Sequence, residues 1–301
     1  MGNYLAEYSE EEFSEKLIGQ LETMVAPACL SPHDRPQAIL LGGQSRAGKT
    51  TLYHVFLEMF KKDVIVINGD EYRKLHPRFF ALQSAYGDKA VDYTAQWAGK
   101  MVEAIVEALS SAGYNLVIEG TLRTSQVPLA TATLLRERGY DVSLALMAVK
   151  PEISLASCQL RYEQMRLAGT APRATDPAHH RKIVDQIVRN LAVLEDSGMF
   201  DQIYLYNRSR ERLYPQEGLA MTASQALEEG AFRELVRGGA EALRFAQGRA
   251  REASAQELTR EFRPCEFSMS YLVYNPVPCT GELGWSRLRG RIDADPTNLY
   301  G

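Results

Sequence analysis

The chain has 301 residues, of which 45% are hydrophobic and 24% are charged, and its formal net charge is −4. These values are typical of a soluble globular protein of one large or two modest domains, and they exclude a chain drawn to nucleic acid or anionic membrane by its overall charge. The acidic amino terminus, MGNYLAEYSEEEFSEK, lacks the apolar core of a secretory signal, and no apolar run is long enough to span a membrane. We therefore expect a cytoplasmic protein that binds neither membrane nor nucleic acid.

The first predicted element is a helix over residues 9–25. Ser9 is a suitable N-cap, and apolar residues recur on one stripe of the helix at Phe13, Leu17, Leu21 and Val25. The segment PACLSPHDRPQ that follows contains three prolines in eleven residues, which predicts a linker rather than a helix or strand.

Short apolar strands then alternate with helices. Strands are predicted at 38–43, 63–69, 115–120, 141–149 and 201–207, and helices from near residue 49 and over 91–112, 125–138, 151–167 and 177–197. Near-continuous apolar strands separated by helices are typical of a parallel sheet covered on both faces. The sequence thus predicts an α/β fold of three layers, with a parallel five-stranded sheet and helices on both faces.

Four regions follow from this pattern. We expect an N-terminal helix and linker over 1–36, a phosphate-loop core over 37–215, a charged C-terminal helical region with glycine breaks over 216–264, and a tail over 265–301. The tail fits neither the strand nor the helix pattern, so its structure is left unassigned.

A phosphate-binding loop is predicted directly after the first strand. Its frame is a glycine, four residues and then Gly-Lys-Thr, and it ends where a helix begins. Backbone N–H groups of such a loop face the phosphates of a nucleotide. Lys49 would reach the β and γ phosphates, and the Thr50 hydroxyl would bind Mg²⁺. The predicted nucleotide-binding residues are Gly43, Gln44, Ser45, Arg46, Ala47, Gly48, Lys49, Thr50 and Thr51.

Arg46 is the unusual residue of this loop. A positive φ at a residue other than glycine costs roughly 1 kcal/mol, far too little to unfold a domain. We expect its side chain to turn outward to solvent. Two alternatives stay open: the guanidinium lies along the phosphates as an extra cation, or it obstructs the loop and weakens nucleotide binding.

Acidic and basic side chains supply the other groups that a phosphoryl transfer needs. Asp70 and Glu119 follow two predicted strands at the carboxyl edge of the sheet, where ligands bind in open α/β folds. They are candidates for the base and the second metal partner. Arg161 and Arg173 are candidate cations for the transferring phosphate, although spacing alone favours two ordinary surface arginines.

Read together, these residues resemble the zeta toxin family, the toxin half of toxin–antitoxin pairs. The resemblance rests on the strings AILLGGQSRAGKTT, VIVINGDEYRKLHPRF, YTAQWAGKMVEAI, YNLVIEGTLRT, ALMAVKPEIS, RYE and RATDPAHH, in order from about residue 37 to 207. The acidic amino-terminal helix and the GGQS wording look closest to the PezT branch of that family.

The resemblance implies a P-loop kinase of adenylate-kinase-like architecture. It implies transfer of phosphate from ATP to the 3′-hydroxyl of the sugar of UDP-N-acetylglucosamine, which blocks cell-wall synthesis. Asp70 then matches the general base, Glu119 the acid beside the metal, and Lys49 a catalytic cation. The resemblance also assigns the remaining matched residues: Glu103, Thr121 and Arg123 to the substrate, and Arg161 and Arg173 to the transferring phosphate.

A small helical antitoxin is the partner that the resemblance implies. Two other functions stay open: a phosphotransferase with another small acceptor such as an antibiotic, and a nucleotide-binding protein with little catalysis. Arg46 stands where the family usually has a small residue, and residues 265–301 have no counterpart in it.

Overall fold

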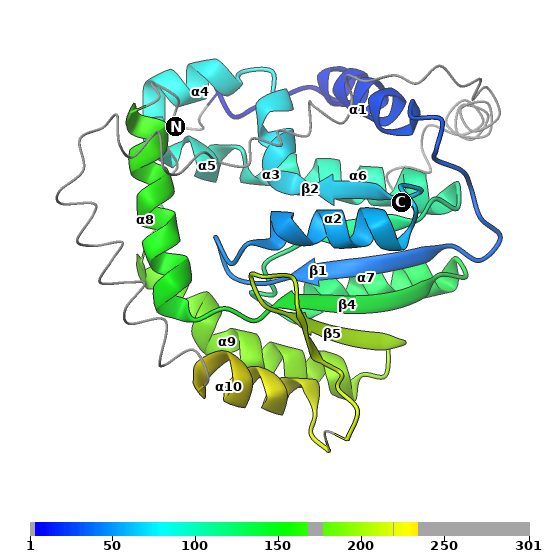
Figure 1. Ribbon diagram of the computed structural model, residues 1–301. Coiled ribbons are helices and arrows are strands. Elements are labelled where there is room, and N and C mark those ends of the chain that lie inside the picture. Colours follow the sequence, from blue (N-terminus) through cyan, green and yellow to red (C-terminus); the bar gives the residue numbers. More distant parts are fainter. Residues whose placement is uncertain (1–3, 168–176, 219, 234–301) are drawn as a thin grey trace.

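A six-stranded sheet forms the middle layer of the fold in the computed structural model, which describes residues 4–167, 177–218 and 220–233 (Figure 1). The strands lie in the order β2-β3-β1-β4-β5-β6. They are β1 (Gln37–Gly42), β2 (Ile65–Asn68), β3 (Leu116–Glu119), β4 (Asp141–Met147), β5 (Gln202–Tyr206) and β6 (Arg212–Tyr214). The first five are parallel, as the sequence predicts.

The predicted count of five strands is wrong by one, because β6 adds an antiparallel edge to β5. The two strands are joined by a short turn in which the Asn207 N–H donates to Glu211 O at 3.0 Å. β6 has three residues, Arg-Leu-Tyr, and so carries no apolar run by which a strand is recognised in a sequence.

Helices cover both faces of the sheet (Figure 1). The longer ones are α1 (Glu10–Val25), α2 (Lys49–Met59), α6 (Ala95–Ser111), α7 (Gln126–Glu137), α8 (Pro151–Leu167), α9 (Pro177–Asp196) and α10 (Ala223–Arg233). Short helical turns fill the segment between β2 and α6: α3 (Gly69–Tyr72), Arg73–Leu75, α4 (Phe79–Tyr86), Gly87–Lys89 and α5 (Ala90–Tyr93).

The hydrophobic core divides into two parts, one on each face of the sheet. Because side chains alternate along a strand, Ala38 and Leu40 of β1 join the core with α1, α6, α7, α9 and α10. Ile39 and Leu41 point the other way, into the core under α2. Both faces are therefore apolar, which explains the continuous apolar strands in the sequence.

The helix predicted over 91–112 is broken at Thr94 into α5 and α6. Thr94 has φ −98° and ψ 2°, and its hydroxyl bonds back to Ala90 O at 3.1 Å. Arg73 donates to Val91 O at 2.7 Å and to the Thr94 hydroxyl at 3.2 Å, so it caps the end of α5. The Arg73 guanidinium, which comes from outside the helix, thus accounts for the break at Thr94. The spacing of apolar residues along the helix does not reveal this break.

The helix predicted at the amino terminus is present, with a complete capping box. The Ser9 hydroxyl accepts from Glu12 N at 3.1 Å, and the Glu12 carboxylate accepts from Ser9 N at 2.9 Å. Phe13, Leu17 and Leu21 are buried in the core beside α6. The apolar stripe in the sequence is therefore the docking face of α1.

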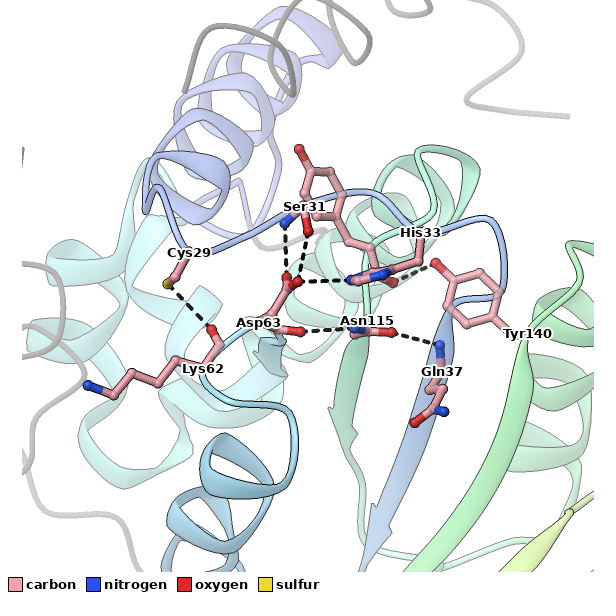
Figure 2. Close-up of polar contacts among 9 residues, drawn as sticks. Cys29, Ser31, His33, Gln37, Lys62, Asp63, Asn115 and Tyr140 are labelled. Atoms are coloured by element: carbon pink, nitrogen blue, oxygen red, sulfur yellow. Dashed lines mark hydrogen bonds and ion pairs between the residues drawn. The ribbon is translucent and has the colours of Figure 1, made fainter. Parts of the chain in front are cut away.

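The proline-rich linker is fastened to the amino end of the sheet by a polar cluster around Asp63 (Figure 2). Ser31 donates its backbone N–H and hydroxyl to the two carboxylate oxygens of Asp63, at 2.9 and 2.8 Å, and His33 Nε2 lies 2.9 Å from Asp63 Oδ2. Asn115 joins the Asp63 carbonyl to the backbone of Gln37. Ser31 and His33 each bond to the carboxylate, so this Ser, His and Asp group is an anchor and not a catalytic triad.

Within the described residues, no helix combines the length and the hydropathy that crossing a bilayer requires. The predicted tail over 265–301 lies outside the described residues, as does the predicted C-terminal helical region beyond residue 233. Inside that region, α10 packs on α9 and β5.

Candidate active site

The predicted phosphate loop connects β1 to α2 at the carboxyl edge of the sheet (Figure 1). Gly48 is the N-cap of α2 and has φ 102°, a conformation that strongly favours glycine. Within the loop, Ala47 N donates to Gln44 O at 3.1 Å. The first N–H groups of α2 have no partner inside the helix, which gives the loop the usual setting for an anion.

Lys49 lies inside this loop and is 7% exposed. Its Nζ donates to Gly43 O at 2.9 Å and to Gln44 O at 3.2 Å, and it lies 3.7 Å from Glu119 Oε1. Glu119 ends β3 beside Leu41 of β1. The structure therefore brings together the loop lysine and one of the two strand-end acids that the sequence singled out.

Tyr53 is a site residue that the sequence analysis missed. Its hydroxyl donates to Glu119 Oε2 and accepts from Asn68 Nδ2 at 3.3 Å. Burial, followed by the Glu119 charge, raises the pKa of Tyr53 far above its usual range, so the phenol stays protonated. Tyr53 is four residues beyond Lys49, on the same side of α2. That spacing is the only sequence signal for it.

Asp70 stands at the first turn of α3, where its N–H donates to the Asn68 side chain at 3.1 Å. The carboxylate is well exposed, at 64%, and Arg73 Nε contacts its Oδ1 at 3.0 Å. The same guanidinium caps α5, so Asp70 is held by a residue that is itself fixed. Arg73 is a second functional candidate that the sequence analysis did not identify.

Thr121 and Arg123, the predicted substrate residues, flank Leu122 in the loop after β3, and both are exposed. Leu122 is buried, with φ 52°, and lies directly against Gly42 at the end of β1. Asn190 of α9 donates to Leu122 O at 2.9 Å. Leu122 thus pins the loop while its two neighbours are free to meet a ligand.

For the three other predicted residues, the structure gives the exposure of two and does not describe the third. Glu103 is exposed on α6, next to Val102, which would lie 3.0 Å from a Cβ placed on Gly69. Arg161 is exposed on α8, and the adjacent Tyr162 hydroxyl reaches Asp88 at 3.4 Å. Arg173 lies outside the described residues.

Arg46 adopts φ 62°, the left-handed conformation. Its side chain is half-buried, and its Nη2 atom is enclosed with no hydrogen-bond partner in the described part of the chain. The expectation that this side chain turns freely outward is therefore wrong, since one guanidinium nitrogen is shielded from water.

Arg208, which follows β5, holds the backbone of the same loop and was also missed. It donates to Arg46 O, to Ala47 O at 3.3 Å and to the Ser157 hydroxyl of α8 at 2.9 Å. Burial lowers the pKa of this guanidinium, although it remains charged at neutral pH. Nothing local in the sequence connects residue 208 to a loop some 160 positions earlier.

The Gln44 side chain turns away from the loop into the protein. It is buried and donates to Val149 O at 2.8 Å and to the Ser154 hydroxyl at 2.9 Å. Ser154 in turn contacts Nε2 of the buried His180, at 2.8 Å. Burial lowers the pKa of His180 and favours the neutral ring. Only the backbone of Gln44 is left for a nucleotide.

The predicted magnesium ligands supply oxygen donors of the right kind. Thr50 is exposed in the first turn of α2, and the Glu119 carboxylate is held by Lys49 and Tyr53. The described residues contain no group of three or more His, Cys, Asp or Glu side chains that could hold a metal by themselves. A hydroxyl and one carboxylate fit Mg²⁺ of the kind that completes its shell with phosphates and waters.

Comparison with known proteins shows that this chain is similar to the members of one protein family. The model of the Zeta toxin family matches residues 23–218. The chain is 41% identical over 249 residues to Toxin PezT of Streptococcus pneumoniae, covering 82% of this chain and 98% of that protein. It is 35% identical over 227 residues to Toxin zeta of Streptococcus pyogenes, covering 75% of this chain and 78% of that protein.

A solved structure supports the same relationship. It belongs to a study of the PezAT chromosomal toxin–antitoxin system of Streptococcus pneumoniae, and it aligns with a TM-score of 0.75 at 40% identity. The alignment covers 82% of this chain and 98% of that chain. The residues that the family model matches, 23–218, include the six strands of the sheet, the phosphate loop, Asp70 and Glu119.

Proposed function

Because this chain belongs to the zeta toxin family, we propose that it is the toxin of a type II toxin–antitoxin pair and an ATP-dependent kinase. The acceptor that we propose is the 3′-hydroxyl of the sugar of UDP-N-acetylglucosamine, whose phosphorylation would block cell-wall synthesis. The observation that carries the proposal is the contact of Lys49 with Glu119, which joins the phosphate loop to the edge of the sheet that bears Asp70.

Asp70 is the base in the proposed reaction. The acceptor oxygen attacks the γ-phosphorus of ATP, the bond to the bridging oxygen breaks, the hydroxyl proton passes to the Asp70 carboxylate and ADP leaves. In a loose transition state the base has little proton transfer to complete early, so its main task is to orient the hydroxyl in line. The ion pair with Arg73 supports this task by fixing the carboxylate.

The remaining groups bind the phosphates and the acceptor. Lys49 would hold the β and γ phosphates, and the loop amides would surround them. Mg²⁺, when bound near Thr50 and Glu119, would neutralise charge on the phosphate oxygens. Thr121, Arg123 and Glu103 would contact the acceptor, while Arg161 and Arg173 would stabilise the charge on the transferring phosphate.

A direct assay tests the reaction. Purified protein is incubated with ATP, Mg²⁺ and UDP-N-acetylglucosamine, and sugar nucleotides are separated by mass. We expect a singly phosphorylated product from the unaltered chain, almost none from Asp70→Ala, and normal amounts from Asp92→Asn, which removes an exposed acid from α5. Turnover with a different acceptor but none with this one would support the alternative phosphotransferase.

The partner that we propose is a small helical antitoxin, and the place of action is the cytoplasm, where ATP and the sugar nucleotide are available. The related PezAT system pairs a toxin with an antitoxin. Expression of this chain alone in a bacterial host should arrest growth, and Asp70→Ala should not. Growth arrest that persists in Asp70→Ala would separate toxicity from phosphotransfer and count against the kinase mechanism.

A further inference from the structure

We propose that Arg46 is a phosphate-binding residue of the loop, a second cation beside Lys49 that contacts the nucleotide directly. The inference rests on the proposed function only in requiring that the loop bind nucleotide. It starts from one atom, the Nη2 of Arg46, which is enclosed and has no hydrogen-bond partner in the described part of the chain.

An unpaired, buried guanidinium N–H is unfavourable. Arginine stays charged in proteins, and a charged donor without an acceptor loses its hydration with nothing in exchange. Lys49 shows how a partnered cation of the same loop behaves, because its Nζ donates to two loop carbonyls and lies near Glu119. Within the described residues Arg46 Nη2 has no such partner, so it can bond an acceptor that arrives with a ligand once the side chain moves to uncover it. An anionic phosphate oxygen is the acceptor that this loop is built to receive.

Arg208 holds the backbone that presents Arg46. Its guanidinium donates hydrogen bonds to the carbonyl oxygens of Arg46 and Ala47 and to the Ser157 hydroxyl of α8. In a trans peptide the C=O and the following N–H point in opposite directions, so the contact with Ala47 O turns the Gly48 N–H away from Arg208. The left-handed conformation of Arg46 is therefore fixed from the β5 side. Arg208 is a positioning residue, and Arg46 is the residue that meets the phosphate.

The competing interpretation is that Arg46 obstructs the loop. The two interpretations predict opposite changes in nucleotide affinity when Arg46 is replaced. A guanidinium that contacts phosphate strengthens the binding of nucleotides that carry phosphate, whereas an obstructing one weakens it. Removal of the charge with retention of the chain length, as in Arg46→Met, is the sharpest change. Arg46→Lys keeps the charge but loses the planar fork, so it should bind with intermediate affinity.

The experiment measures dissociation constants by calorimetry for adenosine and for the β,γ-imido analogue of ATP with Mg²⁺. We expect Arg46→Met to weaken binding of the analogue about tenfold, the effect of one hydrogen bond to a charged group, and to leave adenosine binding unchanged. Lys62→Met is the matched control, because Lys62 is an exposed cation with φ 68° at the far end of α2, and we expect no change from it. Thermal melting checks that each variant is folded.

A double-mutant cycle with Arg208→Met tests the positioning step. If Arg46 acts through the backbone that Arg208 holds, Arg46→Met should have little further effect once Arg208 is replaced, so the two losses should not add. Unchanged or tighter binding of the analogue by Arg46→Met would overturn the inference, as would an equal loss for adenosine. A chain that binds the analogue through Arg46 but transfers no phosphate to UDP-N-acetylglucosamine would instead refute the proposed function alone.

Discussion

Tyr53 shows how a single buried hydroxyl can organise the acids and cations at the edge of a sheet. Its phenol is protonated because burial and the Glu119 charge oppose ionisation, so it can only donate to that carboxylate. Glu119 is thereby held between a neutral donor and the Lys49 ammonium. Such an arrangement holds the carboxylate in one orientation, which suits the proposed role of Glu119 beside a metal ion.

Tyr53→Phe should lower the free energy of unfolding by about 1–2 kcal/mol, because Glu119 and Asn68 lose a buried partner. It should also raise the Mg²⁺ concentration needed for half-maximal phosphotransfer, since the carboxylate is no longer fixed. Urea denaturation and a magnesium titration of the kinase assay measure the two effects. Tyr204→Phe on β5 is the control, because in the described residues the Tyr204 hydroxyl makes no hydrogen bond, and an equal change there would refute the role of Tyr53.

Residues whose roles are local could be predicted from the sequence, and residues whose partners are distant could not. The frame from Gly43 to Thr50 carries its own strand, turn and helix, so the loop and Lys49 follow from spacing alone. Arg73 and Arg208 act by filling the hydrogen-bond needs of backbone carbonyls elsewhere. No pattern in the chain marks those carbonyls, because which of them need a donor depends on the packing of the elements.

Among the elements, α1 carries both a local signal, its capping box, and a signal of tertiary packing, its apolar stripe. Its capping box and apolar stripe are both visible in the sequence, and the structure has both. By contrast, the break at Thr94 and the strand β6 were not predicted. The first depends on Arg73 from another segment, and the second on pairing with β5 in a stretch too short and polar to show periodicity. Strong local patterns therefore fix the long elements, while the short ones follow from their neighbours.

Ser9→Ala should destabilise the protein by about 1 kcal/mol, because the Glu12 N–H loses its acceptor and the capping box is broken. The change is read from the midpoint of urea denaturation with an unchanged slope. Ser84→Ala, an exposed site within α4, serves as the comparison and should fall within about 0.5 kcal/mol of the unaltered chain. A loss for Ser9→Ala no larger than that would mean that α1 is not part of the cooperative unit.

His76 makes the docking of the amino-terminal segment sensitive to acid. Its Nδ1 accepts the Arg78 N–H at 3.1 Å, so Nε2 carries the proton and donates to Ala6 O at 3.3 Å. The ring packs against Tyr8 and Trp97. Burial lowers the pKa of His76, and this outweighs the smaller raising effects of Ala6 O and Glu12.

Because its folded pKa lies below the ordinary value of about 6.5, the stability contributed by neutral His76 is fully present above that value and is lost as the pH falls toward the folded pKa. Stability measured by urea denaturation should therefore decline between roughly pH 7 and pH 5. His76→Gln should be less stable at pH 7 but should show a shallower decline. A decline as steep as in the unaltered chain would assign the pH dependence to other groups, among them the buried His180.

Over the whole molecule, the two ends of the sheet have different roles: one anchors the linker and the other carries the candidate active site. The amino end is closed by the Asp63 cluster, which ties the linker to the strands (Figure 2). The carboxyl end bears the phosphate loop, Asp70 and the loop of Thr121 and Arg123. Separating this anchor from the edge where we propose that ligands bind allows loops from several strands to converge without weakening the core. The convergence needs the loops to be coupled, and Gly42 and Leu122 provide the contact.

Gly42→Ala should break this coupling. A Cβ at residue 42 would lie 2.3 Å from Leu122 Cδ1, so Leu122 must move and the loop must move with it. We expect a loss of about 1–3 kcal/mol in stability from overpacking, and a larger rise in KM for the acceptor than for ATP, because Thr121 and Arg123 flank the displaced residue.

Leu122→Ala alone should be destabilising by about 2–5 kcal/mol, since it leaves a cavity. In the double variant the new methyl group partly fills that cavity, so the two losses should sum to more than the measured total. Gly120→Ala is the control, because Gly120 directly follows β3, the strand beside β1. The added methyl group meets no atom within 4 Å there and should leave stability nearly unchanged. If the losses for Gly42→Ala and Leu122→Ala were simply additive, the loop would owe its position to Asn190 and not to the contact with β1.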